Sequence, residues 1–276
     1  DETGIMQTGW TDIGKKRYYF DMDGILQTGT VVIDKKTYEL DTDGSLKDYT
    51  PKKKSSKKKS SGKSDTSDKS GTSTAKKSVA LTFDDGPSSF TDRLLDCLEE
   101  NNAKATFFMV GTEIASFPDE VKRMKKLGCE LGNHTYDHKD LATLSSDEIS
   151  SEIARVDEQL VNLTGEGASV VRPPYGSVND TVKSTVGTPM ILWSIDTLDW
   201  KTQDVESTVE EVMNNVKDGS IILMHDIFST SVDAAEILIP QLIEEGYQIV
   251  TVHELASLHQ TELSTGVTYG EFNRIK

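Results

Sequence analysis

The chain has 276 residues, enough for one large domain with a sizeable core and a smaller appendage. Its formal net charge of −16 argues against a nucleic-acid partner. Two cysteines are too few for a disulfide framework, and no apolar run approaches the length that spans a membrane. These features argue against a nucleic-acid-binding protein, a disulfide-stapled protein and a membrane-spanning protein.

The first 47 residues contain an internal repeat with a period of twenty. Residues 4–23 read GIMQTGWTDIGKKRYYFDMD and align with residues 24–43, which read GILQTGTVVIDKKTYELDTD. Each copy has two short apolar bursts separated by a turn of Gly or Asp followed by Lys-Lys, which predicts one β-hairpin per repeat.

This repeat resembles the choline- and glucan-binding repeats of Gram-positive surface proteins. In those repeats, aromatic rings form cages for a quaternary ammonium group or platforms for sugars. The second copy has Thr30 where the first has Trp10. Two hypotheses therefore stand side by side: the segment binds a wall polymer, or it is a spacer whose aromatics pack on each other. The candidate aromatics are Trp10, Tyr18, Tyr19 and Tyr38.

Residues 48–77 have no hydrophobic periodicity and consist almost wholly of Lys, Ser, Thr, Gly and Asp. Residues 50–78 alone carry a charge of +8, which leaves −24 for the rest of the chain. This composition predicts a disordered tether that separates two domains. A second hypothesis is that its lysines contact anionic wall polymers.

From residue 78 to about residue 260, predicted strands alternate with predicted helices, and residues 261–276 form a C-terminal tail. The alternation predicts a parallel α/β sheet of about seven strands that closes into a distorted barrel. The strands are expected at residues 79–83, 105–111, 129–131, 169–171, 190–195, 220–224 and 248–252. The helices are expected at residues 90–100, 119–126, 145–163, 180–186, 205–216 and 232–245.

Chemically active residues follow the predicted strands. Asp84 and Asp85 end the first strand, and His134 and His138 follow the third. Two imidazoles and a carboxylate are a typical ligand set for a catalytic zinc-like ion, and Asp85 can supply the carboxylate. Arg172 follows the fourth strand and would be costly to bury unless it is paired, which makes Asp84 its expected partner.

Five of these segments, TFDDGP, HTYDH, RPPYG, DTLDW and LMH, occur in this order. Together they resemble the polysaccharide deacetylases, the NodB-homology domain of carbohydrate esterase family four, over roughly residues 77–258. The resemblance implies that Asp85, His134 and His138 hold a metal ion. It implies further that Asp84 is the general base, and that Arg172 holds Asp84 and keeps it ionised.

The resemblance also implies the remaining catalytic roles. His225 would be the general acid, Asp199 would raise its pKa, and the backbone N–H of Tyr175 would meet the oxyanion together with the metal. Substrate contacts would come from Pro174, Tyr175, Trp200 and Leu223. Phe228 stands where family members often carry His. We assign no role to His253 or His259, and His253 has no acid partner in reach by sequence.

We therefore predict an extracellular, cell-wall-associated, metal-dependent deacetylase. Zinc is the first choice of metal, with cobalt, nickel or iron as alternatives. The substrate is peptidoglycan N-acetylglucosamine or a related β-1,4-linked N-acetylated glycan. The alternatives are an acetylxylan esterase, a chitin or chitooligosaccharide deacetylase, and a non-catalytic module that binds wall carbohydrate.

Overall fold

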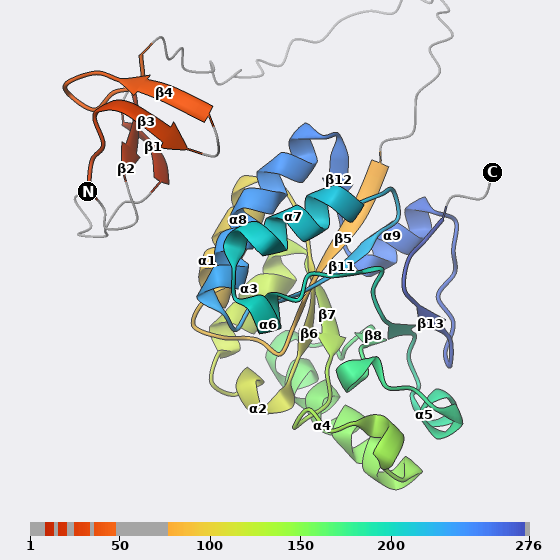
Figure 1. Cartoon of the computed structure of the whole chain (residues 1–276). Helices are drawn as coiled ribbons and strands as arrows, with labels where there is room; N and C mark the ends of the chain where they lie inside the picture. Colours follow the sequence, from red (N-terminus) through yellow and green to blue (C-terminus); the bar gives the residue numbers. More distant parts are fainter. Residues whose placement is uncertain (1–8, 14–15, 21–24, 34–35, 48–76, 274–276) are drawn as a thin grey trace, which may run out of the picture. The chain divides into compact units, whose positions relative to one another are not determined.

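The computed structural model describes residues 9–13, 16–20, 25–33, 36–47 and 77–273 (Figure 1). The chain divides into two compact units, residues 1–71 and residues 72–276. The tether predicted for residues 48–77 lies outside the described residues, except for Lys77. No helix in the described ranges is long and apolar enough to cross a membrane.

The N-terminal unit contains one antiparallel hairpin in each repeat, as predicted. Strand β1 (Gly9–Ile13) pairs with β2 (Lys16–Phe20), and β3 (Gly29–Ile33) pairs with β4 (Lys36–Leu40). Each hairpin is extended by a bridge to the chain that follows it, one from Phe20 to Leu26 and one from Leu40 to Leu46.

The second unit is built on a curled sheet whose strand pairs are all parallel. The strand order is β10-β11-β5-β6-β7-β8-β9-β13, and β12 also pairs with β5. The strands are β5 (Lys77–Asp84), β6 (Thr106–Met109), β7 (Glu130–Asn133), β8 (Val170–Val171), β9 (Met190–Ile191), β10 (Ile195–Asp196), β11 (Ile221–His225), β12 (Tyr247–Ile249) and β13 (Thr268–Tyr269).

The stretch predicted as one strand at residues 190–195 is divided into β9 and β10. These two strands are three residues apart in the chain, yet β10 begins the strand order and β9 lies near its other end. The sheet must therefore curl back on itself, which agrees with the predicted distorted barrel. At the break, the Leu192 N–H donates to Tyr269 O at 2.7 Å and the Ser194 N–H donates to Ile221 O at 3.0 Å.

Helices cover the outside of the sheet (Figure 1). The capping box Ser145–Glu148 starts the long helix α4, as the sequence pattern at this helix start requires. The helices are α1 (Thr91–Glu100), α2 (Gly111–Ile114), α3 (Pro118–Leu127), α4 (Ser146–Thr164), α5 (Asp180–Thr185), α6 (Asp199–Thr202), α7 (Val205–Asn215), α8 (Ser229–Glu244) and α9 (Val252–Leu258). Short 3₁₀ turns lie at Leu141–Thr143 and Pro174–Gly176.

The main core lies between β5, β6 and the helices that pack on them. Leu81 and Phe83 of β5 are fully buried, and the Phe83 ring stacks on Phe107 with centroids 5.5 Å apart. Leu94 and Leu98 of α1 complete this cluster. Burial of each such side chain contributes about 1.5–3 kcal/mol, so β5 is held firmly from both faces.

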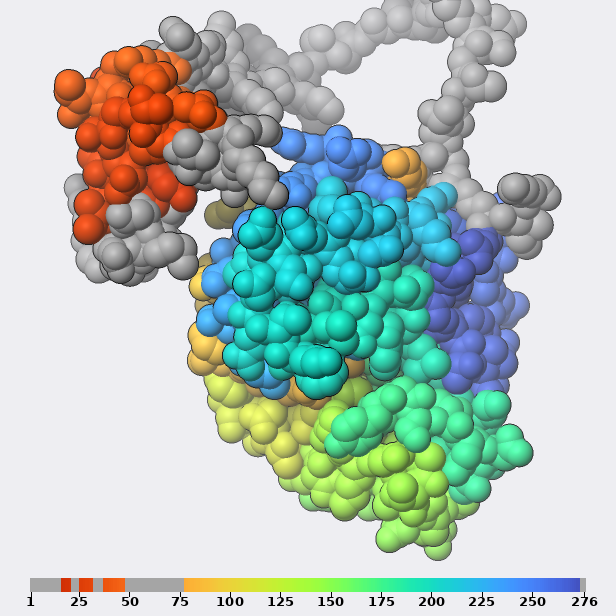
Figure 2. Space-filling model, viewed as in Figure 1, coloured from red at the N-terminus to blue at the C-terminus, as the bar shows by residue number. Residues whose placement is uncertain are grey.

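The last residues of the described chain also belong to this unit. Strand β13 pairs in parallel with β9, and Phe272 is buried. The Phe272 N–H donates to Gly219 O at 2.9 Å. A Cβ atom on Gly219 would lie 1.6 Å from the carbonyl oxygen of Phe272, so only glycine fits there. In Figure 2 this stretch, coloured dark blue, packs directly on the body of the unit.

Candidate active site

The predicted catalytic residues converge at the carboxyl ends of the strands. Asp84 is the last residue of β5, and the strand register places it beside His225 of β11. His134 directly follows β7, and Arg172 directly follows β8. Because parallel strands share one carboxyl edge, residues from distant parts of the sequence meet there.

Asp85, His134 and His138 form a candidate metal centre. Their possible ligand atoms all lie within 4.8 Å of one another. Oδ1 of Asp85 lies 3.5 Å from Nε2 of His134 and 3.4 Å from Nε2 of His138. This oxygen is buried and has no hydrogen-bond partner among the described residues. Three ligand atoms therefore face one point without bonding to each other.

The tautomer of His134 is determined by its second ring nitrogen. Nδ1 lies 2.6 Å from the carbonyl oxygen of Arg172, so it carries the proton and donates it to that oxygen. Nε2 then keeps its lone pair toward Asp85. Burial lowers the pKa of His134 to about 3, so the ring is neutral at neutral pH and suited to bind a cation.

Asp84 is paired with Arg172 in the interior. Nη1 of Arg172 donates to Oδ1 of Asp84 at 2.7 Å, and both side chains are at most 4% exposed. Burial raises the pKa of Asp84, and the charge of Arg172 only partly opposes that rise. Arg172 therefore lowers this pKa, as the sequence predicts, but the loss of hydration is larger and the net shift is upward.

Arg172 also closes the break in the sheet. Its Nε donates to Ile191 O at 3.1 Å, and its Nη2 donates to Leu192 O at 3.0 Å. Nη1 makes a further bond to Oγ1 of Thr82 at 2.7 Å. The buried guanidinium therefore satisfies carbonyl groups that the interrupted strand would otherwise leave unpaired.

His225 is held from two sides by Asp199, the first residue of α6. Nδ1 of His225 lies 2.8 Å from Oδ1 of Asp199, and the His225 N–H donates to Oδ2 at 2.8 Å. Burial lowers the pKa of His225, but the carboxylates of Asp199, Asp84 and Asp85, with Asp199 foremost, together outweigh burial and raise the pKa to about 9. Nε2 of His225 points toward the metal centre, 4.0 Å from Oδ2 of Asp85.

These residues surround a cavity of about 530 Å³. Tyr175 is 70% exposed at its rim, has a left-handed φ of 61°, and places its ring against His138 with centroids 4.8 Å apart. Pro174 is buried, and the preceding Pro173 lines the cavity instead. The lining residues are Asp84, Asp85, His134, His138, Pro173, Tyr175, Trp193, Asp196, Trp200, Leu223, His225 and Phe228.

Three features of the site were not assigned from the sequence. Trp193 and Asp196 line the cavity although they were given no role. Asp226 lies beneath the site, fully buried, with a pKa that burial raises to about 7 and a hydrogen bond from Thr91. A Cβ atom on Gly86 would lie 2.1 Å from Oδ1 of Asp226, so glycine at that position allows the carboxylate to approach the turn.

The aromatic residues of the repeats are described only in part. Tyr18, Tyr19 and Tyr38 are half-buried in their hairpins. The backbone of Trp10 pairs with Tyr19, but the side chain of Trp10 lies outside the described residues.

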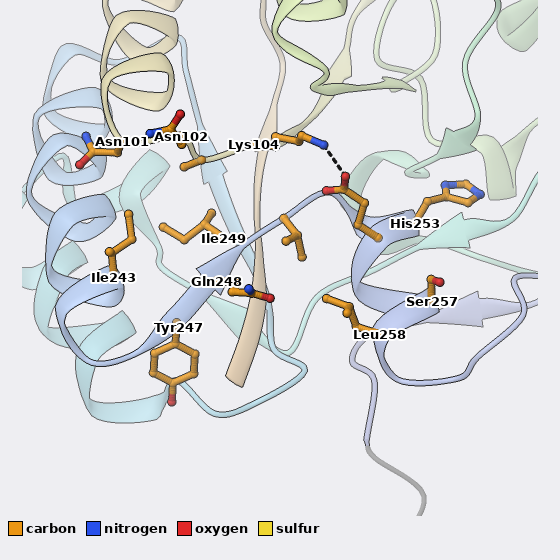
Figure 3. Close-up of a pocket in the computed structure, with 13 residues that line it drawn as sticks. Asn101, Asn102, Lys104, Ile243, Tyr247, Gln248, Ile249, His253, Ser257 and Leu258 are labelled. Carbon is orange, nitrogen blue, oxygen red and sulfur yellow. Dashed lines mark hydrogen bonds and ion pairs between the residues drawn. The ribbon is translucent and has the colours of Figure 1, made fainter. Parts of the chain in front are cut away.

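A second cavity, of about 700 Å³, lies away from the metal centre, between the end of α1, β12 and α9 (Figure 3). His253 lines it and pairs through Nδ1 with Glu130, which raises the pKa of His253. No acid partner of His253 is in reach by sequence, but the fold supplies one. Glu130 is 123 residues away in the chain, so only the folded sheet brings the two together.

Both units of the chain match known protein families. Residues 71–188 match the polysaccharide deacetylase family, and residues 7–47 match the choline-binding repeat. A peptidoglycan-N-acetylglucosamine deacetylase of Bacillus cereus is 42% identical over 194 residues, which cover 67% of this chain and 70% of that protein. The chain belongs to the polysaccharide deacetylase family.

Other relatives in this family are longer than this chain or have a different named activity. The peptidoglycan-N-acetylmuramic acid deacetylase PdaC of Bacillus subtilis is 41% identical, covering 65% of this chain and 39% of PdaC. The chain thus spans about two fifths of the length of the first curated relatives that it matches. The structure of a family 4 acetyl xylan esterase from Clostridium thermocellum, in complex with a cobalt ion, has a TM-score of 0.67 and 33% identity, covering 71% of this chain and 98% of that one.

Proposed function

We propose that this chain is a metal-dependent hydrolase that removes N-acetyl groups from a cell-wall amino sugar polymer. The leading candidate substrate is peptidoglycan N-acetylglucosamine. The observation that carries the proposal is the meeting of a three-ligand metal centre, a paired buried acid and a His–Asp pair around one cavity. We assign residues 78–260 to catalysis, residues 1–47 to wall attachment and residues 48–77 to the tether.

The residues present fit a divalent ion. Ligands at about 2.1 Å from a tetrahedral ion lie about 3.4 Å apart, close to the spacings of Oδ1 of Asp85 from the two imidazole nitrogens. An ion also explains why that buried oxygen lacks a hydrogen-bond donor. When bound, it would polarise the acetyl carbonyl and make an attacking water more acidic. Zinc suits this donor set, with cobalt, nickel or iron as alternatives.

Asp84 takes the proton from the attacking water in this mechanism. Its raised pKa brings the carboxylate closer to the pH at which it works, which favours a general base. Arg172 holds the carboxylate at one oxygen, and the other oxygen, Oδ2, lies 3.6 Å from Nε2 of His134. Asp84 therefore faces the metal centre without being one of its three ligands.

His225 returns a proton to the departing amine. Asp199 binds the Nδ1 side of the ring, so the proton to be donated sits on Nε2, facing the cavity. We assign the backbone N–H of Tyr175 to the oxyanion, and Trp200 and Leu223 to the walls of the pocket for the acetyl methyl group. This small apolar surface matches a methyl group.

The choice of polymer depends on the repeats and the relatives. Repeats of the choline-binding type favour an extracellular, wall-associated enzyme with a wall polymer as a second partner. The named activities of the Bacillus relatives favour peptidoglycan. Acetylated xylan and chitin are the competing substrates, because an ester and an amide pass through the same kind of tetrahedral intermediate. A non-catalytic wall-binding role would show no acetate release on any of them.

The test is acetate release from peptidoglycan, chitooligosaccharides and acetylated xylan by the full chain. We expect activity on peptidoglycan with free amino sugar as product, its loss on chelation and its return with zinc. Activity that persists after complete metal removal would contradict the proposal.

Two variants then separate the proposed general base from a proposed metal ligand. Asp84→Asn should retain bound metal and reduce turnover by about 10²–10⁴-fold. His134→Ala should lose both metal and activity, which elemental analysis of the purified protein would show. Near-normal turnover of Asp84→Asn would refute the role given to Asp84.

A further inference from the structure

The loop that joins the two histidines of the metal centre has an unusual backbone. Thr135 has φ 67° and His138 has φ 58°, so two non-glycine residues out of five lie in the left-handed region. Side chains with a Cβ atom disfavour this conformation. Such a loop keeps its shape only when neighbouring groups hold it.

The carbonyl groups of this loop bond to the start of α2. The Gly111 N–H donates to Thr135 O at 3.1 Å, and the Thr112 N–H donates to Tyr136 O at 2.9 Å. On the near side of the loop, Oδ1 of Asn133 accepts the N–H of Thr135 at 2.9 Å. These bonds hold the first half of the loop.

The N–H groups in the middle of the loop bond to Glu152 of α4. Oε2 of Glu152 accepts the N–H of Tyr136 at 3.0 Å and the N–H of Asp137 at 3.2 Å. Oε1 accepts from Nζ of Lys139 at 3.1 Å. The Glu152 side chain is only 5% exposed. A buried carboxylate is costly unless donors surround it, and here three donors do so.

Glu152 thus contacts the chain between the two ligands and just after the second. The guanidinium of Arg155, three residues after Glu152 in the same helix, lies 3.2 Å from the centre of the Tyr136 ring. Helix α4 therefore contacts the backbone of the loop through Glu152 and the Tyr136 ring through Arg155. None of these contacts reaches the ligand atoms of His134 or His138.

We propose that Glu152 is a positioning residue that sets the distance between the two imidazoles and thereby the affinity of the site for its metal ion. This inference rests on the proposed metal-dependent function. A carboxylate suits the task because it offers only acceptors to three donors, and its charge strengthens each bond. Metal affinity depends on preorganised ligands, so a looser loop must bind the ion more weakly.

The experiment measures zinc affinity by competition with a chromophoric chelator, using the full chain at 25 °C. We expect Glu152→Ala to weaken zinc binding by about 10–100-fold. Glu152→Gln should bind zinc more tightly than Glu152→Ala and more weakly than wild type, because its amide oxygen can still accept both N–H groups while its NH2 group cannot accept from Lys139. The matched control is Glu158→Ala, which removes an exposed glutamate from the same helix and should leave the affinity unchanged.

Glu152→Asp serves as a second variant if Glu152→Ala does not fold. Its carboxylate is one methylene too short to reach the two N–H groups, so it should bind zinc more weakly than Glu152→Gln. Affinity of Glu152→Ala or Glu152→Asp equal to that of the Glu158→Ala control would overturn the positioning role alone. Failure of the wild-type chain to bind zinc, cobalt, nickel or iron would instead overturn the proposed function itself.

Discussion

Two histidine–carboxylate pairs lie in different regions of the same domain. At the active-site cavity, Nδ1 of His225 pairs with Asp199, which also accepts the His225 N–H at 2.8 Å. On α9, Nδ1 of His253 pairs with Glu130, which also accepts the His253 N–H at 3.1 Å. Both carboxylates are buried, and both raise the pKa of their histidine.

The two pairs differ in what surrounds them. His225 is 11% exposed and its Nε2 faces the cavity that Asp84 and Asp85 line. His253 is 46% exposed and lies on a helix that packs beside β5. A histidine–carboxylate pair therefore carries no catalytic meaning by itself. Its position relative to a metal centre and a base gives it one.

The largest difference between the two pairs is expected when each imidazole is removed. His225→Ala should reduce turnover by about 10²–10⁴-fold, because it removes the proton donor to the departing amine. His253→Ala should stay within about twofold of wild type. Steady-state acetate release on a soluble chitooligosaccharide measures both. Equal losses in the two variants would show that His225 has no special role.

The carboxylates give the second test, through the pH profile. His225 must be protonated to act as an acid, so turnover should fall as pH rises through its pKa of about 9. Asp199→Asn removes a charge that raises this pKa. The pH at which turnover falls should therefore decrease by about one pH unit or more. Glu130→Gln should leave that pH unchanged. An unchanged pH dependence in Asp199→Asn would remove His225 from the role of general acid.

The smallest expected effect concerns stability. The pKa of His253 in the folded protein lies above its ordinary value of 6.5. The pairing with Glu130 therefore stabilises the fold fully below pH 6.5, and this stabilisation is lost as pH rises through the folded pKa. His253→Gln should therefore lower the thermal midpoint by about 1–2 °C at pH 6 and by less at pH 9. Thermal unfolding at the two pH values tests this. A larger fall in the thermal midpoint at pH 9 than at pH 6 would contradict the prediction.

Most strands of this domain and its candidate site could be predicted from the sequence, because the chemically active residues directly follow recognisable apolar strands. Val79 to Phe83 is an apolar run interrupted only by Thr82, so the strand and the position of Asp84 at its end follow from the residue pattern. Parallel strands then bring Asp84, His134 and His225 to one edge without any further assumption.

What the sequence could not predict depends on packing between distant segments. Strand β13 has two residues, too few to show a periodicity, and the break between β9 and β10 lies inside a stretch that reads as one strand. Glu152 lies in an amphipathic helix, where an acidic residue usually faces solvent, and only the fold turns it toward Tyr136. The pKa of Asp84 depends on how much water burial removes, which no spacing of residues reports.

Strand β13 has a consequence for how the protein should be handled. It supports β9, whose carbonyl at Ile191 binds Arg172, and Arg172 in turn holds Asp84. A continuous series of hydrogen bonds thus runs from the last described turn of the chain to Asp84, the proposed general base. The backbone carbonyl of Arg172 also holds the ring of His134. Trimming the chain before Thr268, far from these residues in sequence, should therefore loosen both the proposed base and one candidate metal ligand.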